Sequence, residues 1–372
     1  MRRADITPSP GRCILPLLLL VVVPFLAVIV SGCRRQLYEL ENVQISILAV
    51  GDTGDRRAIG DMESGQNLVA RGMASEDRRR PVNIMLLLGD NFYEAGLRAD
   101  KIVTRLKQNI VEPYCRFVEL KGPDSDQVAK ACRLAPEKRH PIPIFAVLGN
   151  HDHYTPGSAK LEREAIPRFV TNWRMPEGVA ESFELGHGVS LVLFDSEVLA
   201  EGAHIETLRD AIRSASGPWR ILVGHRPLRR DLPAEAYEGR HPDLYIESVE
   251  RAVSEAGVPV QAFLSGHEHN LQILEMDPPA PSLHVIAGSG SRTRAIGDED
   301  PRRRFGLEAL GFVRLDLVGA GAENAARLVV RVFQVEGPLG LELAPPKLAA
   351  QWSVEADGHM HETTCPYRKF HP

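Results

Sequence analysis

The stretch QAFLSGHEHN, residues 261–270, joins a short apolar run to a pair of histidines, and it decides how the rest of the chain is interpreted. The apolar run followed by a glycine predicts a buried strand that ends at Gly266. His267 and His269 follow at alternate positions, so their side chains can point towards the same place beyond the strand end. Imidazoles placed in this way indicate a metal site.

Four further apolar runs end in the same manner, each at a glycine followed by a residue type that binds metals. ISILAV leads into GDTGD, NIMLLL into GDNFY, IPIFAVL into GNHDH and RILV into GHRP, which supplies Asp52, Asp90, Tyr93, Asn150 and His225. In sheets covered by helices, sites form at the carboxyl ends of strands. One such ending is typical of an ordinary turn, but five in one chain predict a shared site with enough ligands for two metal ions.

Taken together, the five motifs resemble those of the calcineurin-like metallophosphoesterases, and within them the purple acid phosphatases of the small tartrate-resistant type. The family pattern is D-x-G, G-D-x-x-Y, G-N-H-[DE], a later histidine near a strand end, and G-H-x-H. This chain has GDTG, GDNFY, GNHD, GHRP and GHEH in that order, and the resemblance covers about residues 43–335. It implies an α/β fold of two packed mixed β-sheets flanked by helices, with the metals at one edge of the sandwich.

Two positions distinguish the purple enzymes from their relatives. Most of the superfamily has a metal-binding histidine where this chain has Gly54, which offers no ligand atom from a side chain. The resemblance implies that Tyr93 replaces the missing ligand. A phenolate is a hard anionic oxygen donor and favours a hard trivalent ion. Fe(III) is therefore the metal expected at the first site.

The resemblance also implies how the ligands are divided between the two ions. Three residues would bind Fe(III), namely Asp52, Tyr93 and His269. Three others would bind a divalent ion such as Zn, Fe(II) or Mn, namely Asn150, His225 and His267. Asp90 would bridge the two ions, since a carboxylate has two oxygens to share.

These assignments imply hydrolysis of phosphate monoesters by metal-bound hydroxide, because two cations neutralise the anionic ester and hold the attacking and leaving oxygens in line. His151 would remain unbound and donate a proton to the leaving oxygen or hold a phosphate oxygen. Asp152 and His153 would support the ligands, although a purely structural role for His153 is an equal alternative. The expected substrate is a phosphorylated small molecule or a phosphopeptide.

Two other functions fit parts of the pattern. A phosphodiesterase or nucleotide hydrolase would use the same metal ligands and differ only at the rim of the site. The candidate rim residues are basic, and for each a structural or solvent-exposed role is at least as probable: Arg226, Arg229, Arg230, Arg292 and Arg294. An inactive scaffold that binds phosphorylated ligands is the other alternative, and the intact ligand set argues against it.

The composition is that of an ordinary globular protein. The chain has 372 residues, of which 44% are hydrophobic and 25% charged, so it can bury a sizeable core. Its formal net charge of -5 provides no overall attraction for nucleic acid, and no nucleic-acid binding is expected beyond nucleotide substrates.

The N-terminal segment has the features of an export signal. A short basic start precedes an apolar run from Ile14 to Val30, and small residues follow before Cys33. This ending resembles the lipobox of bacterial lipoproteins, in which the cysteine is acylated and becomes the mature N-terminus. An uncleaved signal anchor is the alternative. Either interpretation places the catalytic domain on the extracytoplasmic side of a membrane, tethered by a lipid or by the anchor.

The expected organisation has four parts. Residues 1–32 form the leader, 33–42 a tether, 43–345 the catalytic domain and 346–372 a C-terminal extension. Outside the leader, three cysteines are available for pairing, namely Cys115, Cys132 and Cys365. A bridge between the first two would close a short loop between the second and third motifs, whereas pairing of either with Cys365 is the alternative.

Overall fold

A computed structural model of the chain describes residues 40–55, 64–229, 242–297, 300–321, 325–337 and 344–363. The region from Asn42 to Thr363 forms one compact unit. The expected leader, Cys33 and Cys365 lie outside the described residues. Within the described part of the chain, no helix is both long and apolar enough to span a bilayer.

The unit is built around two mixed β-sheets. In spatial order, the eight-stranded sheet contains β15 (Met360–Glu362), β14 (Lys347–Glu355), β13 (Arg327–Gln334), β12 (Gly311–Val318), β1 (Val43–Val50), β2 (Ile84–Leu87), β3 (Ile144–Ala146) and β4 (Trp173–Arg174). The seven-stranded sheet contains β11 (Arg303–Leu307), β9 (Leu271–Glu275), β10 (Leu283–Ala287), β8 (Ala262–Ser265), β7 (Trp219–Val223), β6 (Val189–Phe194) and β5 (Ala180–Gly186). All five apolar runs that were predicted to be strands are strands.

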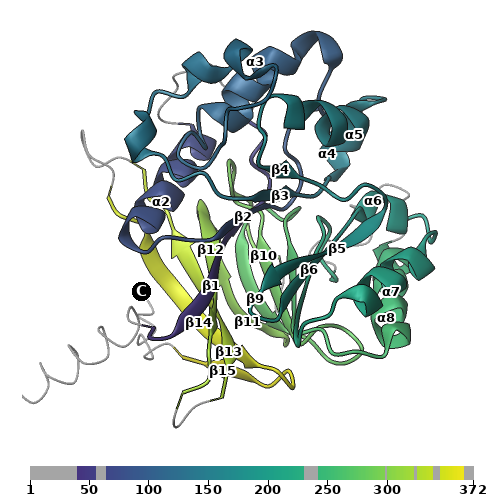
Figure 1. Ribbon diagram of the computed structural model, residues 1–372. Coiled ribbons are helices and arrows are strands. Elements are labelled where there is room, and N and C mark those ends of the chain that lie inside the picture. The colour runs from purple at the N-terminus through teal and green to yellow at the C-terminus, as the bar shows by residue number, and fades with distance from the viewer. Residues whose placement is uncertain are drawn as a thin grey trace, which may run out of the picture. The chain divides into compact units, whose positions relative to one another are not determined.

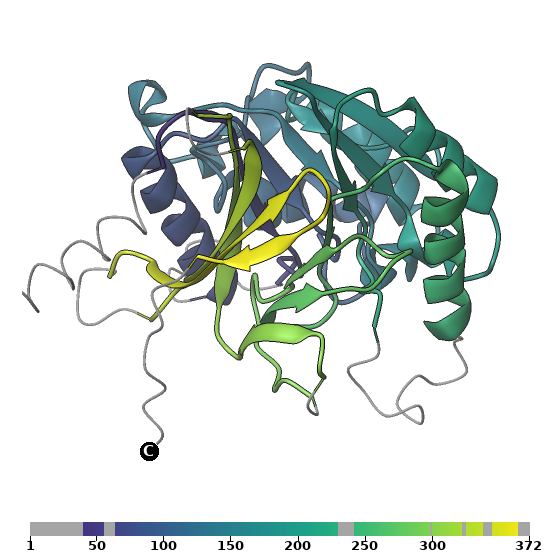
Figure 2. The same cartoon turned by 90° about the horizontal axis from the view of Figure 1, so that it is seen from below.

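Helices cover the outer faces of both sheets. α2 (Gly65–Arg79) and α3 (Ile102–Leu106) pack on the first sheet, and α6 (Ser196–Leu199), α7 (Ile205–Ser214) and α8 (Pro242–Ala256) pack on the second. Two further short helices, α4 (Asn150–His153) and α5 (Ser158–Lys160), follow β3. Figure 1 shows α2 on one side of the sheets and the pair α7 and α8 on the other, and Figure 2 shows α2 and α8 again on opposite sides. The expected arrangement of two packed sheets flanked by helices is confirmed.

The side chains of β1 show why the strands are apolar along their whole length. Ile45, Ile47 and Ala49 point into the core between the two sheets, where they join residues from β7, β8 and β12. Leu48 and Val50 point the other way, into the core beneath α2 and α3. A third core lies between the seven-stranded sheet and helices α7 and α8. Because both faces of β1 are covered, the usual alternation of polar and apolar residues is absent.

The C-terminal strands extend the first sheet. β12 pairs antiparallel with β1 and with β13, and β13 pairs with β14, which in turn pairs with β15. The expected domain boundary at residue 345 therefore falls just before two strands that belong to the eight-stranded sheet. The compact unit continues to Thr363, because β14 hydrogen-bonds along its length to β13.

A disulfide joins Cys115 to Cys132, with the two Cα atoms 4.9 Å apart. Of the pairings that the sequence left open, the structure therefore has the local one. Both cysteines belong to the core beneath α2 and α3. The bridge closes a loop that spans 17 positions of the chain. In the chain-entropy model, the loss of unfolded conformations stabilises the folded state by about 3 kcal/mol.

Candidate metal centre

Five strands end at the same edge of the sandwich. β1, β2 and β3 run parallel to one another in the first sheet, and β7 and β8 run parallel in the second. The loops that leave their carboxyl ends carry all seven of the predicted ligands: Asp52, Asp90, Tyr93, Asn150, His225, His267 and His269. The structure brings these seven side chains together, although their binding of metal ions stays a prediction.

Two oxygen atoms and one nitrogen atom form a triangle where the first metal ion is predicted to bind. The Tyr93 hydroxyl lies 2.9 Å from Oδ1 of Asp52 and 3.1 Å from Nε2 of His269. Nε2 of His269 is 3.4 Å from the same carboxylate oxygen. Atoms bound to one metal ion at about 2.0–2.1 Å are separated by roughly 3 Å or slightly more, so this triangle has the dimensions of a ligand set.

A second triangle of the same size lies beside it. Oδ1 of Asn150 is 3.1 Å from Nε2 of His225 and 3.1 Å from Nδ1 of His267, and the two nitrogens are 3.2 Å apart. The amide nitrogen of Asn150 donates to the hydroxyl of Tyr154 at 2.9 Å, which turns the amide oxygen towards the histidines. The Nδ1 atom of His225 lies 2.8 Å from the carbonyl oxygen of Leu88. That contact fixes the ring and leaves Nε2 free to bind a metal.

Asp90 connects the two triangles. Its Oδ1 is 3.5 Å from Nε2 of His225, and ligand atoms of Asp52, Asp90 and His225 all lie within 4.8 Å of one another. The three side chains are buried, so their charges are poorly solvated unless a cation is bound. Two carboxylates, a phenol, an amide oxygen and three imidazoles are a donor set that suits one hard trivalent and one divalent ion.

The close packing of two loops explains why residue 54 is a glycine. A Cβ atom at Gly54 would lie 2.5 Å from the backbone nitrogen of Tyr93 and 2.6 Å from that of Phe92. Any side chain at this position would push away the loop that carries Tyr93. The close approach of the two backbones therefore leaves no room for a side chain at residue 54.

Three of the predicted ligands have an unusual backbone conformation. Asp52, Asp90 and His267 have φ angles of 59°, 53° and 69°, in the left-handed region that residues other than glycine seldom adopt. Such conformations cost free energy and concentrate at functional sites. The backbone of His267 is also held by a hydrogen bond, since its amide donates to the side-chain Oδ2 of Asp52 at 2.8 Å.

Burial and neighbouring charges shift the protonation of the site. Burial raises the pKa of Asp90, and the charge of His225 offsets only part of that rise. Burial would also raise the pKa of Asp52, but the hydrogen bond from His269 and the charges of His225 and His269 hold it below its usual value. Burial and the nearby charges of His225 and Arg226 lower the pKa of His267 well below its usual value. His267 is therefore neutral, which is the form that binds metals.

Asp152 holds the loops of the site together, although it faces neither triangle. Its carboxylate accepts hydrogen bonds from the backbone amides of Asn91 at 3.1 Å, Phe92 at 3.0 Å and Gly149 at 2.9 Å. Burial raises the pKa of Asp152 to about 6, and the charge of Asp90 adds to the rise. The carboxylate thus joins the loop of Asp90 and Tyr93 to the loop of Asn150.

A second buried carboxyl group extends this network. Glu162 accepts a hydrogen bond from the side-chain amide of Asn91 at 3.1 Å and another from Ser158 at 3.2 Å. Burial and the charge of Asp152 raise the pKa of Glu162 well above its usual value. Neither Glu162 nor Asn91 was singled out from the sequence, because no local motif marks a residue whose partner is 71 positions away.

His151 lies at the open side of the site. Its Nδ1 is 2.5 Å from the carbonyl oxygen of Glu94, and its Nε2 is 3.9 Å from Oδ2 of Asp90. The ring is partly exposed and lies against the rings of Tyr93 and Tyr154. His151 therefore belongs to neither triangle, in agreement with its predicted position beside the metals.

His153 points away from the ligands. Its Nε2 lies 3.1 Å from both carboxylate oxygens of Asp195, which also accept a hydrogen bond from Arg163 at 3.2 Å and from the backbone amide of Glu197 at 3.2 Å. Burial would lower the pKa of His153, but the contact with Asp195 raises it overall. The partner of His153 is Asp195, which is not one of the seven ligands. This contact favours a structural role for His153 over a role in supporting the ligands.

The basic residues proposed for the rim occupy different environments. Arg226 pairs through two nitrogens with Glu197 at 2.6 and 3.0 Å, and its third nitrogen is 3.5 Å from Nε2 of His267. Arg229 is buried and lies 3.3 Å from Asp300, which favours a structural role. Two other rim candidates, Arg292 and Arg294, lie on the loop after β10. The fifth candidate, Arg230, is outside the described residues.

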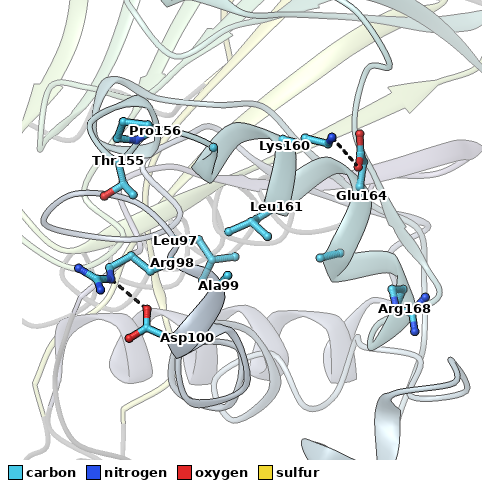
Figure 3. Close-up of a pocket in the computed structure, with 12 residues that line it drawn as sticks. Leu97, Arg98, Ala99, Asp100, Thr155, Pro156, Lys160, Leu161, Glu164 and Arg168 are labelled. Atoms are coloured by element: carbon cyan, nitrogen blue, oxygen red, sulfur yellow. Dashed lines mark hydrogen bonds and ion pairs between the residues drawn. The ribbon is translucent and has the colours of Figure 1, made fainter.

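A large hollow lies beside, but apart from, the seven ligands. It has a volume of about 920 Å³ and lies between the segment from Leu97 to Asp100 and the segment from Thr155 to Arg168. Figure 3 shows two pairs among its charged groups, Arg98 with Asp100 and Lys160 with Glu164, whereas Arg168 pairs with Asp124 outside the lining. None of the seven predicted ligands lines this hollow.

Comparison with known proteins identifies the class. The family model for calcineurin-like phosphoesterases matches residues 45–271, and the chain belongs to this family. Purple acid phosphatase 17 of Arabidopsis thaliana is 24% identical over 304 residues, which cover 75% of this chain and 79% of the plant protein. The chain is thus a metal-dependent phosphoester hydrolase with similarity to purple acid phosphatases.

Solved structures share the fold at low sequence identity. GAP50, described as the anchor in the inner membrane complex of Plasmodium, has a TM-score of 0.56 and 18% identity, over 82% of this chain and 89% of its own. The purple acid phosphatase PPD1 of yellow lupin (Lupinus luteus) has a TM-score of 0.53 and 16% identity, over 82% of this chain and 53% of its own. These similarities support the two-sheet fold and say nothing further about the site.

Proposed function

We propose that the protein hydrolyses phosphate monoesters at a binuclear centre of Fe(III) and a divalent ion. The observation that carries this proposal is the pair of adjacent triangles of ligand atoms, with Asp90 between them. Fe(III) is assigned to the triangle of Asp52, Tyr93 and His269. A divalent ion, either Zn, Fe(II) or Mn, is assigned to the triangle of Asn150, His225 and His267.

The bound ions would supply positive charge to the ester and an activated water for attack on phosphorus. The chain's own contribution is to orient the groups around them. Because the Glu94 carbonyl holds Nδ1 of His151, the Nε2 atom is the one directed towards Asp90 and the substrate side. When His151 is protonated, Nε2 has a proton that can pass to the leaving oxygen.

A comparison of the hydrolysis rates of phosphate monoesters and diesters tests the proposal directly. Protein of measured iron and divalent-metal content should hydrolyse aryl and alkyl phosphate monoesters faster than the matching diesters, with an optimum on the acid side of neutrality. Faster turnover of diesters or nucleotides on the same preparation would favour the alternative function on this site. No turnover of either class by fully loaded protein would favour the scaffold.

We also propose that the mature protein is held at the extracytoplasmic face of a membrane by a lipid on Cys33. The support is sequence alone: a basic start, an apolar centre and small residues before the cysteine. An acyl chain gives membrane affinity that grows with the number of buried methylene groups, and two or more chains hold a protein stably.

Replacing Cys33 with serine should leave the precursor unprocessed at the lipoprotein step. Wild-type protein, but not the variant, should gain the mass of a lipid by mass spectrometry of the intact chain. A Cys13→Ser variant is a suitable control, because Cys13 lies inside the expected leader and should not affect processing. Equal masses and equal membrane partitioning of wild type and Cys33→Ser would instead indicate an uncleaved signal anchor.

A further inference from the structure

An arginine from a distant loop lies on the face of the Tyr93 ring. The guanidinium carbon of Arg292 is 4.6 Å from the ring centroid, close enough for a cation–π interaction. Arg292 comes from the loop after β10, whereas Tyr93 follows β2, so the contact joins the two sheets of the sandwich. The tyrosine is almost completely buried, with 1% of its surface exposed, and the arginine covers part of it.

Other groups fix this stacked position. Nη2 of Arg292 forms a hydrogen bond to the Glu94 carboxylate at 2.5 Å and lies 3.9 Å from Asp55. The carbonyl oxygen of Tyr93 accepts a hydrogen bond from Arg105 at 2.7 Å, and the ring of His151 meets the tyrosine edge-on at a centroid distance of 4.6 Å. The ring is therefore held on several sides, with its hydroxyl directed at Asp52 and His269.

We propose that Arg292 is a positioning residue that tunes the bond between Tyr93 and Fe(III), setting the energy of its visible absorption and the reduction potential of the iron. This inference rests on the proposed function, because it requires iron bound to the phenolate. Arg292 acts through the tyrosine and need not touch the substrate.

The direction of the effect follows from electrostatics. A positive charge over the ring would stabilise the electrons of the phenolate more than those of an iron bound to the hydroxyl, because that iron would be farther from the guanidinium than the ring is. The charge-transfer transition from phenolate to iron then needs more energy. The same charge makes the phenolate a weaker donor and disfavours the higher oxidation state, which raises the reduction potential.

Arg294 provides a matched control. It lies on the same loop, its side chain is 41% exposed against 39% for Arg292, and it pairs with Glu268 at 3.4 Å. Its removal takes away the same charge at the same exposure, and the cation–π contact between Arg292 and Tyr93 stays in place. The contact over the ring is thereby separated from the general charge of the loop.

The experiment compares visible spectra and iron reduction potentials of the oxidised holoenzyme, with no substrate present, for Arg292→Gln, Arg292→Lys and Arg294→Gln. Arg292→Gln should move the band to longer wavelength and the potential to a more negative value. Arg292→Lys keeps the charge but not the planar contact, so its band should lie between those of Arg292→Gln and wild type. Arg294→Gln should leave the band at the wild-type position.

The possible failures are distinguishable. A band at the wild-type position in iron-loaded Arg292→Gln would overturn the inference about Arg292 while leaving the proposed function intact. Equal shifts in Arg292→Gln and Arg294→Gln would also overturn it, because the effect would then be that of loop charge alone. If Arg292→Gln does not fold or retain iron, the position of the visible band in Arg292→Lys tests the inference. A band at the wild-type position would overturn it. A colourless, iron-loaded wild type would count against the proposed function itself.

Discussion

Asp90→Asn is expected to lower kcat/KM by about a thousandfold or more, which corresponds to roughly 4 kcal/mol of transition-state stabilisation. The residue is buried, and its carboxylate lies between the two triangles of ligand atoms. An amide keeps the shape of the side chain and can still accept the hydrogen bond that the His151 amide donates at 3.0 Å. It cannot supply the negative charge that balances two cations, so bound metal should fall together with activity.

Metal content and kinetics measured on the same sample test this expectation. Asp100→Asn is a matched control, because Asp100 is exposed and pairs with Arg98 in the loop that follows the site. The control should keep wild-type metal and activity. An Asp90→Asn protein with two bound metals and wild-type turnover would contradict the assignment of Asp90 as the bridge.

Asp152→Asn is expected to weaken metal binding by about 10- to 100-fold, as is typical when a group that orients metal ligands is lost. The carboxylate accepts three backbone N–H groups, from Asn91, Phe92 and Gly149. An asparagine has only one accepting oxygen, so its NH2 group would face at least one backbone N–H. A buried donor without an acceptor costs about 1–3 kcal/mol, and the unfolding free energy should fall by a similar amount.

Urea unfolding and metal titration of the apoprotein measure the two effects separately. Asp210→Asn is the control, since Asp210 is exposed and pairs with its neighbour Arg209 at 2.8 Å. The two variants carry the same chemical change in opposite environments. Unchanged metal affinity in Asp152→Asn would show that the two loops keep their positions without this carboxylate.

The sequence places the seven candidate ligands at one edge of the sheets because the relevant information is local. Each ligand follows directly after a short apolar run, so the strand and its terminal residue are recognised together, as at Asp52 after β1 and His225 after β7. The parallel arrangement of strands then places those terminal residues at one edge. Gly54 and Tyr93 were related to each other only through the family resemblance, and the structure places their two loops in contact.

Interactions between segments far apart in the chain could not be predicted from the sequence. β1 pairs with β12, and Ser46 contacts Asp316 across 270 positions of the chain, which no local pattern indicates. The segment of β14 was assigned to a C-terminal extension, although its hydrogen bonds to β13 make it part of the eight-stranded sheet. Glu162 and the stacking of Arg292 on Tyr93 likewise depend on tertiary packing, so they were visible only in the folded chain.

The visible spectrum of the oxidised protein, with iron quantified on the same sample, tests the central claim most directly. An Fe(III)–phenolate bond absorbs visible light, so concentrated wild-type protein should be purple or pink. Tyr93→Phe should lose the colour and keep the ring, and part of the iron should remain bound through the carboxylates and His269. A colourless wild type loaded with oxidised iron, or a protein active only with two divalent ions, would contradict the account.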